Sequence, residues 1–229
     1  MISGRKAIGI LGGMGPEATV DLMAKIVRST PARRDQDHIP IVVYSDPTTP
    51  DRTAYILGRG ENPLPFLIRG AKALQAMGAD VIAIGCNTAH YFYDEIADAV
   101  DVKVLHIARE VAAYVSKMGI RRVLVLATDG TRVAGIYDAV APEVLYPDEI
   151  HQRLVMDAIY SLKAGKHEDA RVAFLKVLDY AERLDVDGVI LGCTELPVIA
   201  QGVKTGINLI DTTLVLARAA VRETLGFPI

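Results

Sequence analysis

Cysteine is scarce in this chain, and its scarcity excludes several kinds of protein. Only two of the 229 residues are cysteine, Cys86 and Cys193, so no disulfide framework can hold the fold together. We therefore expect both to be free thiols. Two cysteines without close cysteine or histidine partners do not supply a usual zinc ligand set, so we also expect no metal site.

Long apolar runs and an excess of one charge are missing too. No apolar run approaches the length of about 18 to 20 residues that a membrane-spanning helix needs. The apolar run in "MISGRKAIGILGGMG" breaks at Gly12-Gly13 without a small-residue cleavage site, so we interpret it as a first strand rather than a signal peptide and expect a cytoplasmic protein. Lys and Arg number 25 against 28 Asp and Glu, without blocks of like charge, so partners such as nucleic acid or a membrane have little support.

The residues that are abundant form short β-branched runs that alternate with helical patterns. We expect strands at residues 6–13, 39–46, 80–87, 102–107, 121–128, 142–147, 187–194 and 207–211. Most are continuous apolar runs, which are typical of strands covered on both faces by helices. Helices are expected from Pro16 onward, in the stretch that ends at Gly78, and over residues 147–165 and 167–185. The alternation predicts an α/β fold with parallel sheets.

The two halves of the sequence resemble each other. "KAIGILGGMGPEAT" is similar to "RRVLVLATDGTRVAG", and each is followed by a later strand that ends in Gly-Cys. We interpret this as two copies of one α/β unit, that is, two pseudo-symmetric domains with an active site in the cleft between them. The first domain is expected to comprise residues 1–101 with the C-terminal 211–229, and the second residues 102–210.

The position of the two thiols suggests acid–base chemistry. In an open parallel sheet ligands bind beyond the carboxyl ends of the strands, so facing halves would bring Cys86 and Cys193 to opposite sides of one ligand. One thiolate can then remove a proton from carbon while the other thiol returns one on the far face, and a cysteine pKa of about 8.5 needs only a modest shift for this. A lone Gly-Cys at a strand end is more often a buried structural thiol, but its recurrence in both halves favours the reactive interpretation.

Four motifs, "GILGGMGPEAT", "DRTAYILG", "GCNTAH" and "GCTE", together resemble the aspartate/glutamate racemase family, specifically its aspartate racemase branch. The resemblance extends over nearly the whole chain. It implies a racemase that interconverts L- and D-aspartate, or glutamate, without pyridoxal phosphate or any other cofactor. It also implies two catalytic cysteines in a cleft between two α/β domains, and commonly a homodimer.

The resemblance also assigns roles to individual residues. Cys86 and Cys193 match the proton-transfer pair, and Arg52 and Lys163 match residues associated with the substrate's side-chain carboxylate. Others match the surroundings of the α-carboxylate or loops that border the pocket: Asn87, Thr88, Thr194, Met14, Thr128 and Thr131. Arg52 and Lys163 each have a structural alternative, as a solvated surface arginine and as a lysine that satisfies a helix C-terminus.

One position departs from the glutamate racemase branch. There a histidine commonly follows the second Cys-Thr, whereas this chain has Glu195. The difference favours the aspartate branch and removes a candidate auxiliary acid–base residue. We expect Glu17, His90 and Glu195 to be structural residues or to lie behind those that touch the substrate.

Other functions remain open at this point. The pattern Gly13-x-Gly15-x-x-Ala18 fits a relaxed dinucleotide fingerprint, which makes a nucleotide-dependent enzyme an alternative. The acidic residue expected about 20 residues further on has no counterpart, because Asp46 comes too late. We interpret the glycines instead as allowing the backbone to approach a small anionic substrate.

The remaining alternatives are proteins that have the same cleft but a different function. One is a non-catalytic amino-acid-binding protein, which the retention of both thiols makes less attractive. The others are relatives on the same scaffold, namely hydantoin racemases, maleate isomerases and arylmalonate decarboxylases. The pair of cations Arg52 and Lys163 favours a dicarboxylic substrate over these.

Overall fold

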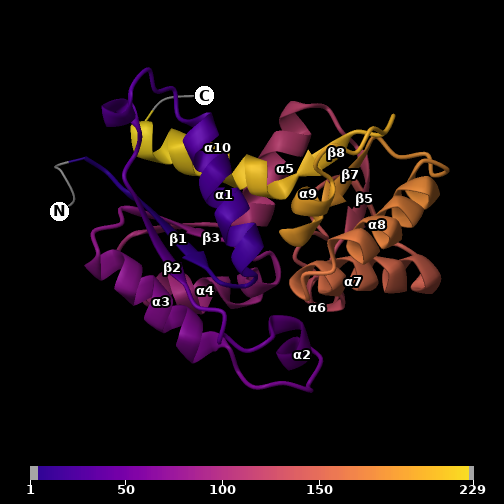
Figure 1. Ribbon diagram of the computed structural model, residues 1–229, viewed down its shortest axis with the longest axis horizontal. Helices are drawn as coiled ribbons and strands as arrows, with labels where there is room; N and C mark the ends of the chain where they lie inside the picture. The colour runs from indigo at the N-terminus through magenta and orange to yellow at the C-terminus, as the bar shows by residue number, and fades with distance from the viewer. Residues whose placement is uncertain (1–4, 227–229) are drawn as a thin grey trace.

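The computed structural model describes residues 5–226, which form two parallel four-stranded sheets flanked by helices (Figure 1). The strands are β1 (Ile8–Gly12), β2 (Ile41–Ser45), β3 (Val81–Ile84), β4 (Lys103–Leu105), β5 (Arg122–Leu126), β6 (Glu143–Leu145), β7 (Gly188–Leu191) and β8 (Leu209–Asp211). Each lies within the segment that the sequence predicts. The strand order is β2-β1-β3-β4 in one sheet and β6-β5-β7-β8 in the other, and this equivalence agrees with a duplicated unit.

The helices connect the strands and begin and end at recognisable signals. They are α1 (Pro16–Ser29), α2 (Arg52–Ile56), α3 (Leu64–Ala76), α4 (Tyr93–Asp98), α5 (Ile107–Lys117), α6 (Asp129–Val133), α7 (Glu149–Lys163), α8 (His167–Ala181), α9 (Glu195–Ile199) and α10 (Thr212–Leu225), with 3-10 turns η1 (Asp35–Asp37) and η2 (Thr88–Phe92). Pro16 starts α1, as expected, and aspartate carboxylates cap α2, α7 and α10 by accepting backbone N–H bonds.

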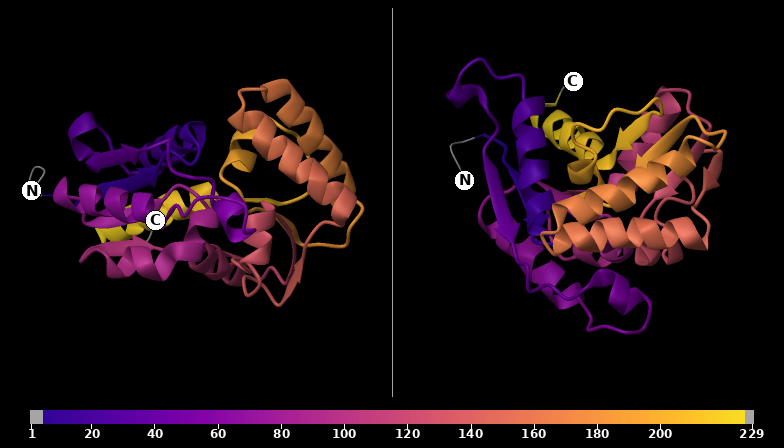
Figure 2. Two further views of the ribbon diagram at one scale, coloured as in Figure 1. Left: turned by 90° about the horizontal axis from the view of Figure 1, so that it is seen from below. Right: turned by 45° about the vertical axis from the view of Figure 1, so that its right-hand side comes forward.

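Each sheet is covered on both faces. In the first sheet α1 and α10 pack on the face that carries Ile8 and Ile10, and α3 and α4 pack on the face that carries Leu11. In the second, α7, α8 and α9 cover one face, and α5 covers the other (Figures 1 and 2). Burial on both faces explains why the strands are continuous apolar runs, and the predicted fold class is confirmed.

The last helix returns to the first sheet. Although α10 follows β8 of the second sheet, its residues Leu216 and Val221 share a core with Ile8 and Ile10 of β1. The domain limits at residues 101/102 and 210/211 remain a prediction. Within residues 5–226, no helix is both long and apolar enough to cross a bilayer.

The turn after β1 has a packing reason for its glycine. Gly13 has a φ of 90°, and a Cβ there would lie 2.4 Å from the backbone of Asp46 at the end of β2. Its N–H donates to the Thr19 hydroxyl at 2.8 Å. Gly13 is therefore explained by the close approach of Asp46, which differs from our expectation that these glycines make room for a substrate.

Candidate active site

The two cysteines occupy equivalent places in the two sheets. Cys86 follows β3 and Cys193 follows β7, each after one intervening glycine, and each residue is 5% exposed. Both thiols are free and buried, and they come from opposite halves of the chain.

Cys193 lies against a carboxylate. Its Sγ–H donates to Oε2 of Glu195 at 2.9 Å. Burial raises the pKa of the Cys193 thiol well above its ordinary value and the nearby Glu195 raises it further, while Lys163 opposes the rise. These neighbours favour the protonated thiol at this position.

Cys86, in contrast, lies beside a cation. Arg52 is the first residue of α2, after the capping Asp51, and is only 6% exposed, which excludes the solvated surface arginine. Burial lowers the pKa of Arg52, but the negative groups around it, Cys86 first and then Asp51, outweigh burial and raise it. Arg52 is therefore a buried, permanent cation next to the Cys86 sulfur.

Most of the Arg52 guanidinium is already held by the protein. Nη1 donates to the carbonyls of Thr49 at 3.1 Å and Pro50 at 2.8 Å, and Nη2 donates to the carbonyl of Met14 at 3.3 Å. Buried Nε has no partner. A hydrogen bond to Cys86 also contributes to the raised pKa of Arg52, so this side of the guanidinium lies toward the sulfur rather than toward another carbonyl.

Lys163 is the second cation of the site. It ends α7, its side chain is 22% exposed, and its Nζ lies 3.8 Å from Oε1 of Glu195. Burial lowers the pKa of Lys163, but Glu195 and Cys193 outweigh that effect and raise it. Lys163 is thus a basic residue in the last turn of α7 whose ammonium group lies toward Glu195. Nζ also lies 5.2 Å from the ring of Tyr160.

Asn87 carries a second unused donor. It is 1% exposed, and its Oδ1 accepts a hydrogen bond from the hydroxyl of Tyr137 in the second half. Burial raises the pKa of Tyr137 far above its usual range, so the hydroxyl remains a donor. The bond orients the amide and leaves Nδ2 buried without a partner. Nδ2 is therefore placed to donate to a ligand carboxylate.

The predicted threonines are arranged differently. The hydroxyls of Thr88, Thr128 and Thr131 form a closed triangle with O···O distances of 2.8, 3.0 and 3.1 Å. Three mutual bonds use all three hydroxyl hydrogens, so in this arrangement the triangle joins η2 to α6 rather than offering donors to a carboxylate. The Thr194 hydroxyl donates to Oε2 of Glu195 at 3.3 Å.

His90 supports the loop that carries Cys86. Its Nδ1 donates to the carbonyl of Cys86 at 2.9 Å, and its Nε2 accepts from the N–H of Ile107 at 3.0 Å. Burial lowers the pKa of His90 from 6.5 to about 3, with His106 adding to the effect. The ring is neutral and structural, as expected from the sequence.

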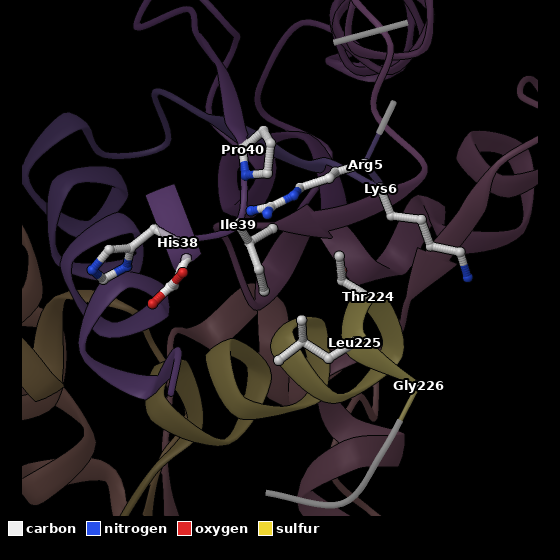
Figure 3. A pocket seen from close by; sticks show the side chains of 9 residues that line it. Arg5, Lys6, His38, Ile39, Pro40, Thr224, Leu225 and Gly226 are labelled. Atoms are coloured by element: carbon white, nitrogen blue, oxygen red, sulfur yellow. The ribbon is translucent and has the colours of Figure 1, made fainter. Parts of the chain in front are cut away.

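One cavity lies beside the candidate site, and another lies at the opposite end of the first sheet. One of about 200 Å³ is lined by Gly15, Pro16, Glu17, Ala18, Leu162, Lys163, Gly165 and Glu195. The other, of about 510 Å³, lies where β1 and β2 begin, among Arg5, Lys6, His38 and the end of α10 (Figure 3). Only the first adjoins the residues around Cys193. Within residues 5–226, no cluster of three metal-binding side chains occurs.

Sequence reasoning missed two contributors to the site. Glu195 was expected to be structural or to lie behind the residues that touch the substrate, and its hydrogen bond to Cys193 agrees with that expectation. Tyr137 and Tyr160 belong to no recognisable motif. In the folded chain the Tyr137 hydroxyl bonds to Asn87, and the Tyr160 hydroxyl bonds to Asp51.

Comparisons with known proteins identify the family. The sequence profile described as Asp/Glu/Hydantoin racemase matches residues 11–220. The chain belongs to this family. A racemase was therefore predicted correctly.

Individual relatives agree with this membership. The broad specificity amino-acid racemase RacX of Bacillus subtilis is 31% identical over 96% of this chain and 99% of its own. A Picrophilus torridus aspartate racemase structure matches with a TM-score of 0.85 and 34% identity, covering 96% of this chain and 94% of that one. A glutamate racemase from Francisella tularensis, at 20% identity and a TM-score of 0.71 over 97% of this chain and 82% of that one, shares the fold.

Proposed function

We propose that this racemase inverts acidic amino acids, aspartate above all, by proton transfer at Cα between Cys86 and Cys193 without an added cofactor. The observation that carries the proposal is the pair of buried thiols after equivalent strands, one beside a cation and the other bonded to a carboxylate. That difference suits a pair in which one sulfur is a thiolate while the other keeps its proton.

The reaction needs only these two groups. A thiolate removes the Cα proton, so the C–H bond breaks and an S–H bond forms, and the electron pair stays on the substrate, delocalised into the α-carboxylate. The opposite thiol then gives its proton to the other face of Cα and becomes a thiolate. Asn87 Nδ2, buried and unpaired, is placed to stabilise the charge on the α-carboxylate.

The substrate is argued from charge. One relative is named for broad specificity and another for aspartate, so family membership alone does not choose between them. Arg52 and Lys163 are two cations close to the thiols, and Lys163 also lies 3.8 Å from Oε1 of Glu195. A dicarboxylic amino acid offers this pair one more anionic group than a monocarboxylic amino acid does, which favours a dicarboxylic substrate.

The proposal predicts hydrogen exchange at Cα. Purified protein incubated with L-aspartate in D2O should lose optical rotation while deuterium enters Cα, detected by polarimetry and mass spectrometry. Cys86→Ala and Cys193→Ala should each lower racemisation by more than about 10³-fold, because each removes one of the two acid–base groups. A carbonyl reagent that traps pyridoxal phosphate should have no effect. Racemisation that survives either cysteine change would contradict the two-thiol reaction.

The nucleotide alternative is disfavoured by the occupancy of α1. The N–H of Gly15, the residue that precedes α1, donates to Oε1 of Glu195 at 3.2 Å, so a carboxylate of the protein lies at the helix start where a pyrophosphate would bind. A homodimer and a cytoplasmic location remain part of the proposal, and light scattering of the purified protein would test the first.

A further inference from the structure

One tyrosine contacts the chain neighbours of both thiols. Tyr137 lies in the turn between α6 and β6 and is fully buried. Its hydroxyl donates to Oδ1 of Asn87, the residue after Cys86. The edge of its ring lies against Gly192, the residue before Cys193, so closely that a Cβ on this glycine would be 3.2 Å from Cε2 of the ring. A single side chain therefore connects the loop of one cysteine with the loop of the other.

The ring of Tyr137 is held by the core of the second half. It belongs to the apolar cluster that also contains Val125 of β5 and Ile190 of β7. Because close-packed core side chains keep their rotamers, the ring gives the hydroxyl a fixed place relative to β7, the strand that leads to Cys193. Burial also raises the pKa of Tyr137 above its usual range, so the hydroxyl keeps its hydrogen for Asn87.

The hydrogen bond from Tyr137 decides which end of the Asn87 amide faces the site. Oδ1 accepts from the hydroxyl, and Nδ2, on the other side of the amide, is buried without a partner. An amide with its ends exchanged would present an acceptor where a carboxylate needs a donor. Among residues 5–226, Tyr137 is the only side chain hydrogen-bonded to this amide, so the direction of Nδ2 depends on it.

We propose that Tyr137 is a positioning residue that directs the Asn87 amide donor at the α-carboxylate of the substrate and fixes that donor relative to β7. This inference rests on the proposed two-thiol racemisation. When the Cα–H bond breaks and its electron pair moves into the α-carboxylate, the negative charge on the carboxylate oxygens grows. A donor in a fixed place then stabilises the transition state more than it stabilises the bound substrate. The proton itself passes only between Cα and the thiols, and Tyr137 contributes geometry.

Tyr137→Phe tests this role because it removes the hydroxyl and keeps the ring against Gly192. We expect kcat for aspartate racemisation to fall at least about tenfold, less than the loss of about 10²–10³-fold for a donor that is removed outright, while KM changes less than about threefold. Polarimetry measures both constants. Tyr146→Phe is the matched control, because it removes a hydroxyl bonded at 2.7 Å to Asp138, the residue after Tyr137, and should keep the wild-type constants.

A second background separates positioning from a general weakening of the fold. In Asn87→Ala the amide is gone, so adding Tyr137→Phe should lower kcat by less than about twofold further, because the hydroxyl has no amide left to orient. A hydroxyl that only supports the fold would cause its full loss again in that background. Deuterium incorporation at Cα, followed over hours by mass spectrometry, measures these slow variants.

The outcomes distinguish the role of Tyr137 from the proposed function. Wild-type kcat in Tyr137→Phe, an equal loss in Tyr146→Phe, a rise in KM without a loss of kcat, or a full loss repeated in the Asn87→Ala background each overturns the positioning role. Wild-type racemisation would then leave the two-thiol reaction in place. A wild-type protein that neither racemises aspartate nor exchanges its Cα hydrogen overturns both.

Discussion

Arg52 illustrates how a charged side chain is shared between structure and binding. Three carbonyl groups, from Met14, Thr49 and Pro50, receive its N–H bonds and bring two loops together. The unpaired Nε remains, in a residue that is 6% exposed. A planar guanidinium can donate to loop carbonyls along one edge and to a carboxylate along the other. A lysine ammonium lacks this planar arrangement of donors.

Arg52→Lys should therefore lower kcat/KM for aspartate by about 10²-fold, the loss of one or two charge-assisted hydrogen bonds. Selectivity for aspartate over alanine should fall with it, because alanine has no second carboxylate. Steady-state assays with both amino acids measure this. Arg69→Lys, at an exposed ion pair with Asp46, is the control and should keep the wild-type values. An unchanged preference for aspartate in Arg52→Lys would remove Arg52 from substrate recognition.

Some site residues can be recognised in the sequence because they are rare, repeated or part of a motif, whereas others are defined by the direction of their side chains. Cys86 and Cys193 stand out because they are rare and repeated, and the resemblance singles out Arg52. The triangle of Thr88, Thr128 and Thr131 depends on hydroxyl directions that no spacing encodes. Glu195 is visible in the sequence, but its direction toward the sulfur is set by how α9 starts.

At the scale of elements, η2 and α5 are tied together by one neutral imidazole. His90 donates to the carbonyl of Cys86 and accepts from Ile107, the first residue of α5. The chain after Cys86 forms the 3-10 turn η2, and the His90 ring of this turn bonds back to the Cys86 carbonyl that it supports. The position of the Cys86 sulfur thus depends on a ring that must stay unprotonated to accept the Ile107 bond.

His90 predicts an acid-sensitive fold. The folded pKa of about 3 lies below the ordinary 6.5, so the unfolded chain binds the proton first as pH falls. The stability that the neutral ring provides is full above pH 6.5 and declines toward pH 3, by up to about 4–5 kcal/mol. Urea unfolding from pH 7 to pH 4 should show a flatter decline in His90→Gln than in wild type. His167→Gln, on the exposed start of α8, should follow wild type, and equal slopes in all three proteins would contradict the prediction.

The first and last residues of the strands are less well predicted by the sequence than the strands themselves. Each strand begins and ends inside its apolar run; β3, for example, spans Val81–Ile84 within the expected residues 80–87. After β3, the Gly85 N–H still donates to the Leu11 carbonyl of β1 at 2.8 Å, and the chain then leaves the sheet at Cys86. A continuous apolar run indicates burial. Buried site residues such as Cys86 therefore belong to the same apolar run as the strand, and the run does not show where the strand ends.

At the scale of the molecule, the halves meet through polar bonds around the thiols. The Tyr160 hydroxyl on α7 donates to Oδ2 of Asp51 before α2 at 3.2 Å, and the Tyr137 hydroxyl donates to Asn87. Gly130 allows α6 to approach α2 so closely that a Cβ would lie 2.7 Å from Thr53 Cα. Both cysteines are 5% exposed, so we expect substrate entry to require some of these contacts between the halves to open.

Tyr160→Phe should loosen this enclosure without removing the aromatic ring near Lys163. Loss of one hydrogen bond to a carboxylate, about 1 kcal/mol, should raise the alkylation rate of the thiols in the substrate-free protein about fivefold. Iodoacetamide labelling followed by mass spectrometry measures each cysteine separately. Tyr114→Phe, in the groove between α5 and α10, should label at the wild-type rate. No difference between the two variants would show that the Asp51–Tyr160 bond does not limit access.

The architecture was the part that sequence could predict most fully. The apolar runs, the helix starts and the internal repeat together predict two similar α/β units with parallel sheets, and the structure adds that the two sheets have the same strand order. The manner in which the halves close is set by contacts between distant residues, such as Tyr160 with Asp51. Those contacts depend on the folded geometry, and no periodic pattern in the sequence indicates them.

The return of α10 to the first sheet has a consequence for the order of synthesis. The face of β1 that carries Ile8 and Ile10 is covered by α1 and by α10, and the latter comprises residues 212–225. While the chain emerges from the ribosome, α10 is missing from that apolar face until residues 212–225 have been made. The second sheet and its helices, built from one continuous stretch, are complete before then. The half that is translated first is therefore the half that is finished last.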